Sequence, residues 1–145
     1  MIFEPFVATH PRHAEYFQDM PCQVCADTRG IIAVDKNLCT MGAIVFDNFL
    51  PNSAQCTIEI TNPMCLRKGG LITEAAKYIY DVAKRTYVYV LVRETNEKAL
   101  NLDYKIGFEY KCNLKDAYEV NEDIVVLSMT KEQCNHYYTE LERAA

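Results

Sequence analysis

The stretch TYVYVLVRETNEKALNLDYKIGF, residues 86–108, constrains the fold of this 145-residue chain more than any other part of it. Residues 87–92 form an apolar run of β-branched and aromatic side chains, which is typical of a buried strand. Polar residues follow, and both Thr95 and Asn96 can cap a helix because their side-chain oxygens accept hydrogen bonds from its first backbone N–H groups. The pattern predicts a strand that leads directly into a helix.

This predicted helix is short and has a well-marked end. Ala99, Leu102 and Ile106 recur at spacings of three and four, which places them on one apolar stripe. Gly107 can adopt the left-handed conformation that ends a helix, and Phe108 can fold back on the last turn as the hydrophobic part of that cap. We therefore expect the helix to stop at Gly107 and the next strand to begin directly after it.

Periodicity and turn residues predict the other elements. The expected elements are strands at 30–35, 41–49, 56–60, 108–113 and 124–129, and helices at 10–20, at 71–83 and from 130 onward. We expect Thr9 to cap the first helix, and Gln133 lies in capping-box spacing from Thr130. The order β-β-β-α-β-α-β-β-(α) predicts a mixed α/β (α+β) fold.

Length and composition indicate a single domain, residues 1–145, because the 16.7-kDa chain has no linker rich in Gly, Pro or Ser. No apolar run is long enough to span a bilayer, and the N-terminus lacks the basic start and long apolar stretch of a secretory signal. The seven cysteines are an odd number, which favours free thiols in a reducing cytoplasm. A net charge of −5 argues against nucleic acid as a partner and favours a cationic substrate.

A basic, glycine-containing loop lies between the third expected strand and the helix after it. It has the sequence TNPMCLRKGGLI, residues 61–72. The free N–H groups and the positive dipole end of a helix attract an anion, and glycines let the backbone approach that anion closely. The loop therefore predicts an anion-binding site. The alternative is an ordinary glycine-rich turn in which Arg67 and Lys68 are merely solvated.

A resemblance to a known family rests on the strand–helix segment. Asn96-x-x-Ala99, followed by Tyr104-Lys105-Ile106-Gly107-Phe108, resembles the Asn-x-x-Ala…Lys-Leu-Gly-Phe segment of the GCN5-related N-acetyltransferases. The resemblance covers residues 30–131, and short variants of this kind are similar to acetyltransferase-like proteins of phages and prophages. It implies a mostly antiparallel twisted sheet, flanked by helices, around a central β-α-β unit that binds acetyl-CoA. The implied activity is acetyl transfer to a primary amine of unknown identity, with no metal.

In that family the loop before the helix holds the coenzyme A pyrophosphate, with the pattern Arg/Gln-x-x-Gly-x-Gly/Ala. Two alignments compete in this chain. In one, Leu66 and Gly69 match, and Leu71 replaces the last small residue; in the other, Arg67 and Gly70 match, and Ile72 replaces it. The cofactor-binding residues that the resemblance implies are Ile60, Thr61, Asn62, Arg67, Lys68, Gly69, Gly70, Leu71, Asn96 and Ala99. Asn96 can equally be a helix cap alone.

The resemblance also implies two catalytic residues. Glu59 occupies the place of the family's strand carboxylate, which acts as a base; the alternative is a solvent-facing side chain. The family's acid is a tyrosine, but Asp103 occupies that position and Tyr104 follows it, rotated by about 100° on a helix. Because an aspartate ionises near pH 4 unless it is buried, we expect Tyr104 to be the acid; the alternative is a packing role at the helix edge.

Two other hypotheses remain open. His10, His13, Cys22 and Cys25 include two pairs of zinc ligands and predict either a metal-stabilised N-terminal binding module or, as the plainer reading, surface histidines and partly buried thiols. The second hypothesis is that the chain is a catalytically degenerate scaffold or regulatory protein of the same fold. Several tyrosines could mediate a homodimer. These tyrosines are residues 78, 80, 87, 89, 137 and 138.

Overall fold

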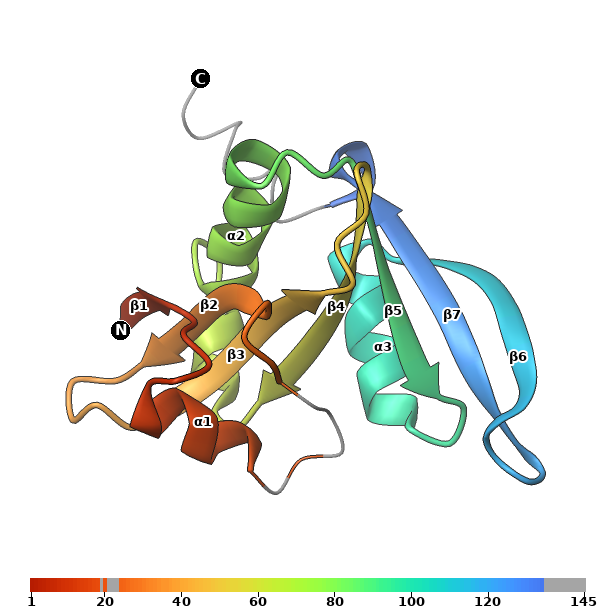
Figure 1. Cartoon of the computed structure of the whole chain (residues 1–145), viewed down its shortest axis with the longest axis horizontal. Helices are drawn as coiled ribbons and strands as arrows, with labels where there is room; N and C mark the ends of the chain where they lie inside the picture. Colours follow the sequence, from red (N-terminus) through yellow and green to blue (C-terminus); the bar gives the residue numbers. More distant parts are fainter. Residues whose placement is uncertain (19, 21–23, 135–145) are drawn as a thin grey trace.

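The computed structural model describes residues 1–18, 20 and 24–134 (Figure 1). The strands are β1 (Ile2–Pro5), β2 (Arg29–Val34), β3 (Thr40–Asp47), β4 (Ser53–Ile60), β5 (Tyr87–Arg93), β6 (Glu109–Glu119) and β7 (Glu122–Thr130). The α-helices are α1 (Pro11–Phe17), α2 (Leu71–Ala76) and α3 (Glu97–Ile106). A 3-10 helix η1 (Pro63–Leu66) precedes α2, a π-helix η2 (Lys77–Val82) continues it, and a 3-10 turn η3 (Lys131–Gln133) follows β7.

The strands form one sheet of seven, in the order β1-β2-β3-β4-β5-β7-β6. The pair β4 and β5 is parallel, whereas every other neighbouring pair of these strands is antiparallel. The helix α2 and its π-helical continuation connect the parallel pair, as a crossover between parallel strands requires. The predicted mixed α/β fold with a mostly antiparallel sheet is therefore confirmed.

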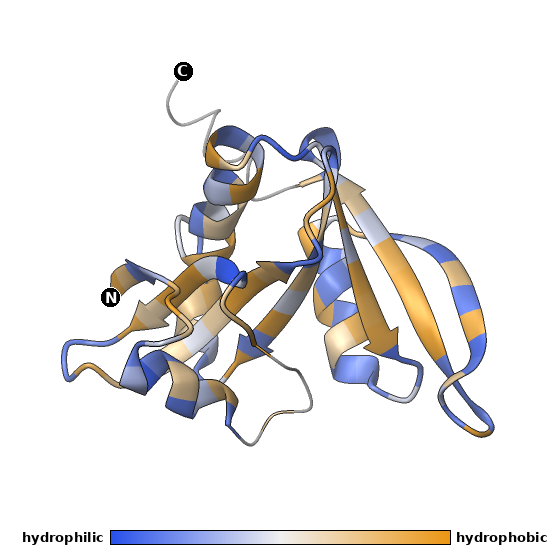
Figure 2. Cartoon of the chain, viewed as in Figure 1, coloured by the Kyte–Doolittle hydropathy of each residue, from blue (hydrophilic) through white to orange (hydrophobic). Residues whose placement is uncertain are grey.

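The helices cover the two faces of the sheet unequally. One buried cluster joins α2, η2 and α3 to the sheet, with Leu71, Ile79, Ile106 and Leu127 among its side chains. A smaller cluster on the other face packs Phe17 of α1 against β2 and β3. The edge strand β6 is exposed along its whole length, and Figure 2 shows hydrophilic and hydrophobic residues alternating on it. None of the described helices is long and apolar enough to cross a membrane.

Several boundaries differ from the prediction: β4 begins at Ser53 rather than 56, β6 continues to Glu119 rather than 113, and the helix expected at 71–83 is an α-helix only to Ala76. The strand β1 was not predicted, because four residues with mixed exposure carry no periodic signal. His10 rather than Thr9 caps α1: its Nδ1 accepts the N–H of Arg12 at 3.2 Å. The capping box of Thr130 and Gln133 is present, but it begins a single 3-10 turn in the described part of the chain, and the rest of the expected helix lies outside it.

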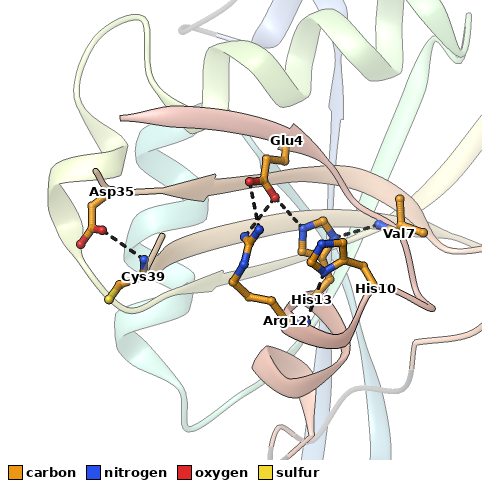
Figure 3. Close-up of polar contacts among 7 residues, drawn as sticks. All are labelled: Glu4, Val7, His10, Arg12, His13, Asp35 and Cys39. Carbon is orange, nitrogen blue, oxygen red and sulfur yellow. Dashed lines mark hydrogen bonds and ion pairs between the residues drawn. The ribbon is translucent and has the colours of Figure 1, made fainter. Parts of the chain in front are cut away.

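Hydrogen bonds among Glu4, Arg12 and His13 connect β1 to α1 (Figure 3). His13 is buried, and its Nδ1 accepts the Val7 N–H at 3.0 Å. The proton must therefore sit on Nε2, which donates to Oε2 of Glu4 at 2.8 Å. Arg12 binds both carboxylate oxygens of Glu4, at 3.0 and 3.2 Å. The hydrogen bonds from Arg12, and then those from His13, hold the pKa of Glu4 below its usual value.

We expect Glu4→Gln to destabilise the protein by about 1.5 to 3 kcal/mol at pH 7, the usual contribution of a hydrogen bond to a charged group. A carboxyl whose folded pKa is lowered contributes stability above its unfolded pKa and loses it as the pH falls through the folded pKa. The difference between wild type and variant should therefore shrink below about pH 4.5. Urea unfolding from pH 7 to pH 3 measures this difference, with exposed Glu15→Gln on α1 as the control. A constant difference at all pH values would contradict the assignment.

Candidate active site

The sheet opens between β4 and β5. These strands pair only from Ser53 to Gln55 and from Tyr87 to Tyr89, and beyond these residues they separate. The space between their C-terminal halves is a cleft of about 710 Å³. Residues 55–59 of β4, residues 90–93 of β5 and one side of α3 line it. A gap in the middle of a sheet exposes unpaired backbone groups, so this cleft can bind an extended ligand by main-chain hydrogen bonds.

The backbone of β4 directs alternate residues into this gap. The carbonyl oxygen of Glu59 lies beside Gly42 on β3, at 3.2 Å from the position that a Cβ on Gly42 would occupy. Glu59 therefore turns its backbone groups toward β3, and its neighbours Ile58 and Ile60 turn theirs toward the open side. Ile60 was predicted as a cofactor-binding residue; Ile58 was missed, although the period-two alternation of the strand could have identified it.

The two residues after β4 are positioned differently. The N–H groups of Thr61 and Asn62 both donate to the carbonyl oxygen of Met41, at 2.9 and 2.8 Å. Tyr16 of α1 also reaches this point, with its Oη 2.7 Å from Oγ1 of Thr61 and 3.1 Å from the carbonyl oxygen of Glu59. The backbone N–H groups of Thr61 and Asn62, two residues predicted to bind the cofactor, are thus already bonded. Tyr16 fixes the end of β4, and its distance along the chain left no local signal for this role.

The side chain of Glu59 lines the cleft. It is half-buried, and this burial raises its pKa above the ordinary glutamate value. The structure gives its carboxylate no hydrogen-bond partner among the described residues. A carboxylate with no partner and a raised pKa is suited to accept a proton from a ligand in the cleft.

The glycine-containing loop is closely folded. Oδ1 of Asn62 accepts the Met64 N–H at 3.0 Å and caps η1. The Gly70 N–H then donates to the carbonyl oxygen of Arg67 at 2.9 Å, which closes a turn. A Cβ on Gly70 would lie 2.4 Å from the carbonyl oxygen of Cys65, so no other residue fits here without moving the backbone.

The loop ends at the N-terminus of α2. The first helical hydrogen bond runs from the N–H of Glu74 to Gly70, so the N–H groups of residues 71–73 have no partner within the helix. Arg67 and Lys68 are exposed beside these donors, with Gly69 between them and the helix. Leu71, which replaces a small residue of the family pattern, is fully buried in the core beneath the helix. The large side chain therefore does not occupy the loop itself.

The N-terminus of α3 has the predicted cap. Oδ1 of Asn96 accepts the N–H of Ala99 at 3.1 Å, whereas the hydroxyl of Thr95 donates to Glu122 at 2.6 Å. Asn96 and Ala99 both line the cleft. The C-terminus also agrees with the prediction: Gly107 has a φ of 125°, and its N–H and that of Phe108 donate to the carbonyl oxygen of Asp103.

The two candidate acids on α3 lie in different environments. Asp103 follows Asn96 and Ala99 along the same side of the helix, is 4% exposed and lines the cleft. Desolvation raises its pKa to about 7. Tyr104 is 46% exposed and is not among the residues that line the cleft. Burial is thus the property of Asp103 that the amino-acid sequence did not show.

The described members of the predicted zinc cluster, which are His10, His13 and Cys25, are not gathered around one point. In residues 1–18, 20 and 24–134 no group of three or more potential ligands is placed to hold a metal ion. Nδ1 of His10 and both nitrogens of His13 are hydrogen-bonded, and Sγ of Cys25 lies 3.9 Å from Asp47. Cys22 lies outside the described residues.

The fold of this chain is that of the GCN5-related N-acetyltransferases. It is similar to spermidine/spermine N-acetyltransferase SpeG from Vibrio cholerae in complex with manganese ions, at 18% identity and a TM-score of 0.61 over 92% of this chain and 76% of that one. Mutant forms of that enzyme match at 18% identity and a TM-score of 0.63, over 88% and 78% of the two chains. A chimera of SpeG and hSSAT matches at 20% and 0.60, over 82% and 75%. No family model and no curated protein sequence matches the chain.

Proposed function

We propose that this protein transfers the acetyl group of acetyl-CoA to a primary amine. The observation that carries the proposal is the cleft between β4 and β5, because it combines unpaired backbone groups with two partly or fully buried carboxyl side chains. The basic loop and the N-terminus of α2 directly follow β4, so one extended ligand with an anionic group can engage both. N-acetyltransferase activity of the structurally similar proteins supports this reading.

The cofactor-binding residues act mainly through their backbone. Ile58 and Ile60 would offer backbone groups to the acetyl carbonyl and the pantetheine amides, in place of the bonded Thr61 and Asn62. Asn96 and Ala99 would lie along the pantetheine arm on the α3 side of the cleft. The pyrophosphate would bind to the backbone N–H groups of the loop and to the cationic side chains of Arg67 and Lys68. The loop residues proposed for this role are Arg67, Lys68, Gly69, Gly70 and Leu71.

Glu59 is the proposed base. An ammonium group must lose a proton before nitrogen can attack a thioester carbonyl, and a carboxylate within reach, directly or through water, can accept that proton. Backbone N–H groups of β4 would stabilise the negative charge that develops on the carbonyl oxygen. The chain thus supplies a base and an oxyanion site on one strand.

The proposed substrate is a cationic amine. Glu59, Asp47 and Asp103 line the cleft, and Arg93 at its edge is paired with Glu122 at 2.5 Å. The net charge of −5 also favours approach of a cation. The similar solved structures are spermidine N-acetyltransferases, so a polyamine is the first substrate to test, followed by aminoglycosides and by protein lysines or N-termini.

Acetyl-CoA should raise the melting temperature. A ligand at a hundred times its Kd stabilises the folded state by about 2.7 kcal/mol. For a domain of this size, that amounts to roughly 5 to 11 °C. Differential scanning fluorimetry with millimolar acetyl-CoA measures the shift, and EDTA in a parallel sample tests a structural metal. If saturating acetyl-CoA produces no shift, the proposed function is wrong; a lower melting temperature in EDTA alone would favour the metal-stabilised module.

A catalytically inactive binding protein of the same fold is the second candidate. The observation in its favour is the departure from the family pattern at Leu71 and Asp103. Such a protein would still bind acetyl-CoA, so turnover separates the two functions. Release of free thiol from acetyl-CoA in the presence of spermidine, followed with a thiol reagent, measures turnover directly.

A homodimer remains a proposal, as do the cytoplasmic location, the absence of a nucleic-acid partner and the likeness to phage proteins. Among the tyrosines that prompted the dimer prediction, Tyr80 is buried and donates to the carbonyl oxygen of Met129 at 3.2 Å. Tyr137 and Tyr138 lie outside the described residues. Strand β6 offers other exposed apolar side chains for the contact, at Tyr110, Leu114 and Tyr118. Light scattering would give the mass in solution.

A further inference from the structure

We infer that Asp103 is the catalytic acid of this protein, protonating the sulfur that leaves the acetyl group. The inference rests on the proposed function and assigns a residue to its last step. It differs from the sequence-based prediction, which assigned the acid role to Tyr104. Three properties of Asp103 support it: position, burial and freedom from other hydrogen bonds.

The position of Asp103 follows from the geometry of α3. It lies seven residues after Asn96 and four after Ala99, which is two helical turns and one. All three residues line the cleft, so Asp103 lies deeper along the path that these residues define. Tyr104 is rotated from this side by about 100° and is 46% exposed, which agrees with its absence from the cleft lining.

The surroundings of Asp103 favour its neutral form. Its residue is 4% exposed, and the structure gives its carboxyl group no hydrogen-bond partner in the described part of the chain. The other titratable or charged groups that line the cleft are Cys25, Asp47 on β3, Cys56 and Glu59 on β4, Arg93 on β5 and Tyr118 on β6. Arg93 is engaged by Glu122 and stacks on Tyr118, with 4.5 Å from its Cζ to the ring centroid. Among the residues that the structure describes, Asp103 therefore has no free cation beside it that would keep it ionised.

A carboxyl group with a pKa of about 7 is matched to a thiolate leaving group. An ordinary thiol has a pKa near 8.5, so proton transfer to the thiolate from such a carboxyl is favourable by about 1.5 pKa units. An ordinary aspartate, with a pKa near 3.9, would hold almost no proton at pH 7, and a tyrosine, with one near 10, would transfer it uphill. Burial thus gives an aspartate the property that this step needs.

The proposed step balances as follows. The amine nitrogen forms a bond to the acetyl carbon, and the carbon–sulfur bond breaks with its electron pair on sulfur. Asp103 gives its carboxyl proton to that sulfur and becomes a carboxylate, while Glu59, which has already passed the first ammonium proton to solvent, takes the second proton from the nitrogen. The products are the N-acetyl amine and a thiol. Asp103 regains a proton from solvent and Glu59 releases one, so the enzyme returns to its initial state.

Steady-state kinetics with acetyl-CoA and the amine found to turn over tests the assignment. Asp103→Asn keeps the size of the side chain but has no proton to give, and we expect it to lower kcat about 10²-fold with unchanged acetyl-CoA affinity. Exposed Glu97→Gln on the same helix is the matched control. Wild-type kcat should fall as the pH rises through about 7, and Asp103→Tyr should move this decline toward the tyrosine range near pH 10.

A direct titration does not depend on turnover. NMR of the protein labelled with ¹³C at aspartate carboxyl carbons, assigned with Asp103→Asn, should show Asp103 titrating near pH 7. A titration near pH 4, or a loss of kcat in Tyr104→Phe but not in Asp103→Asn, would overturn the inference while leaving the acetyltransferase intact. If neither the wild type nor any variant binds acetyl-CoA or turns it over, both the proposed function and this inference are wrong. If Asp103 had only a structural role, kcat would decline at the same pH in wild type and in Asp103→Tyr.

Discussion

Glu59→Gln should lower kcat for acetyl transfer by about 10²-fold or more, the usual contribution of a general base. The amide has nearly the same shape as the carboxylate but cannot accept a proton. Glu59 is half-buried in the cleft with no hydrogen-bond partner among the described residues, so its removal should disturb no structural contact. We expect the melting temperature and its increase with acetyl-CoA to be unchanged.

The pH dependence of this defect distinguishes a base from a residue that only binds the amine. An aliphatic amine has a pKa near 10.4, so at high pH the substrate arrives neutral and needs no base. The ratio of wild-type to variant kcat should therefore shrink as the pH approaches 10. Exposed Glu97→Gln again serves as the control. A defect of equal size at every pH, confined to the KM of the amine, would assign Glu59 to binding alone.

The strand and helix order could be predicted because local signals set most of these elements. The strand–helix unit around Asn96 and Gly107 has its cap and its stop within a few residues of sequence, and both are as predicted. β1 had no such signal, because its position depends on the pairing of Ile2 with Val34 and on the contact between Glu4 and His13. Contacts of this kind depend on the folded arrangement rather than on nearby residues.

Several residues of the candidate site could be predicted from the sequence, but their burial and hydrogen bonding could not. The identity of Asp103 at the acid position was visible in the sequence, but its protonation depends on burial beneath β4 and β5, which only the structure shows. Thr61 and Asn62 were predicted to bind the cofactor, yet the N–H groups of both donate to Met41 on the neighbouring strand. Sequence spacing thus identified some residues that line the cleft, such as Glu59, Asn96 and Ala99, whereas tertiary contacts decide which of its groups can act.

Gly70→Ala should impair both stability and cofactor binding. The added Cβ would lie 2.4 Å from the carbonyl oxygen of Cys65 and 2.6 Å from that of Arg67. Both contacts are with backbone atoms, which cannot rotate away, so the loop must open. We expect a loss of about 3 kcal/mol in the free energy of unfolding. The same movement would displace the N–H groups at the start of α2, so the melting-temperature increase with acetyl-CoA should also be lost.

Gly42→Ala provides the comparison that separates these two effects. Its Cβ would lie 3.0 Å from Sγ of Cys65 and from Cδ1 of Ile60, two side-chain atoms that can yield slightly, and 3.2 Å from the backbone carbonyl oxygen of Glu59. We expect this variant to lose about 1 kcal/mol of stability and to keep its melting-temperature increase with acetyl-CoA. The two effects separate because the closest contacts of this Cβ are with side-chain atoms, whereas those at Gly70 are with backbone carbonyl groups of the loop before α2. Full binding of acetyl-CoA by folded Gly70→Ala, measured by isothermal titration calorimetry, would show that the loop does not hold the pyrophosphate.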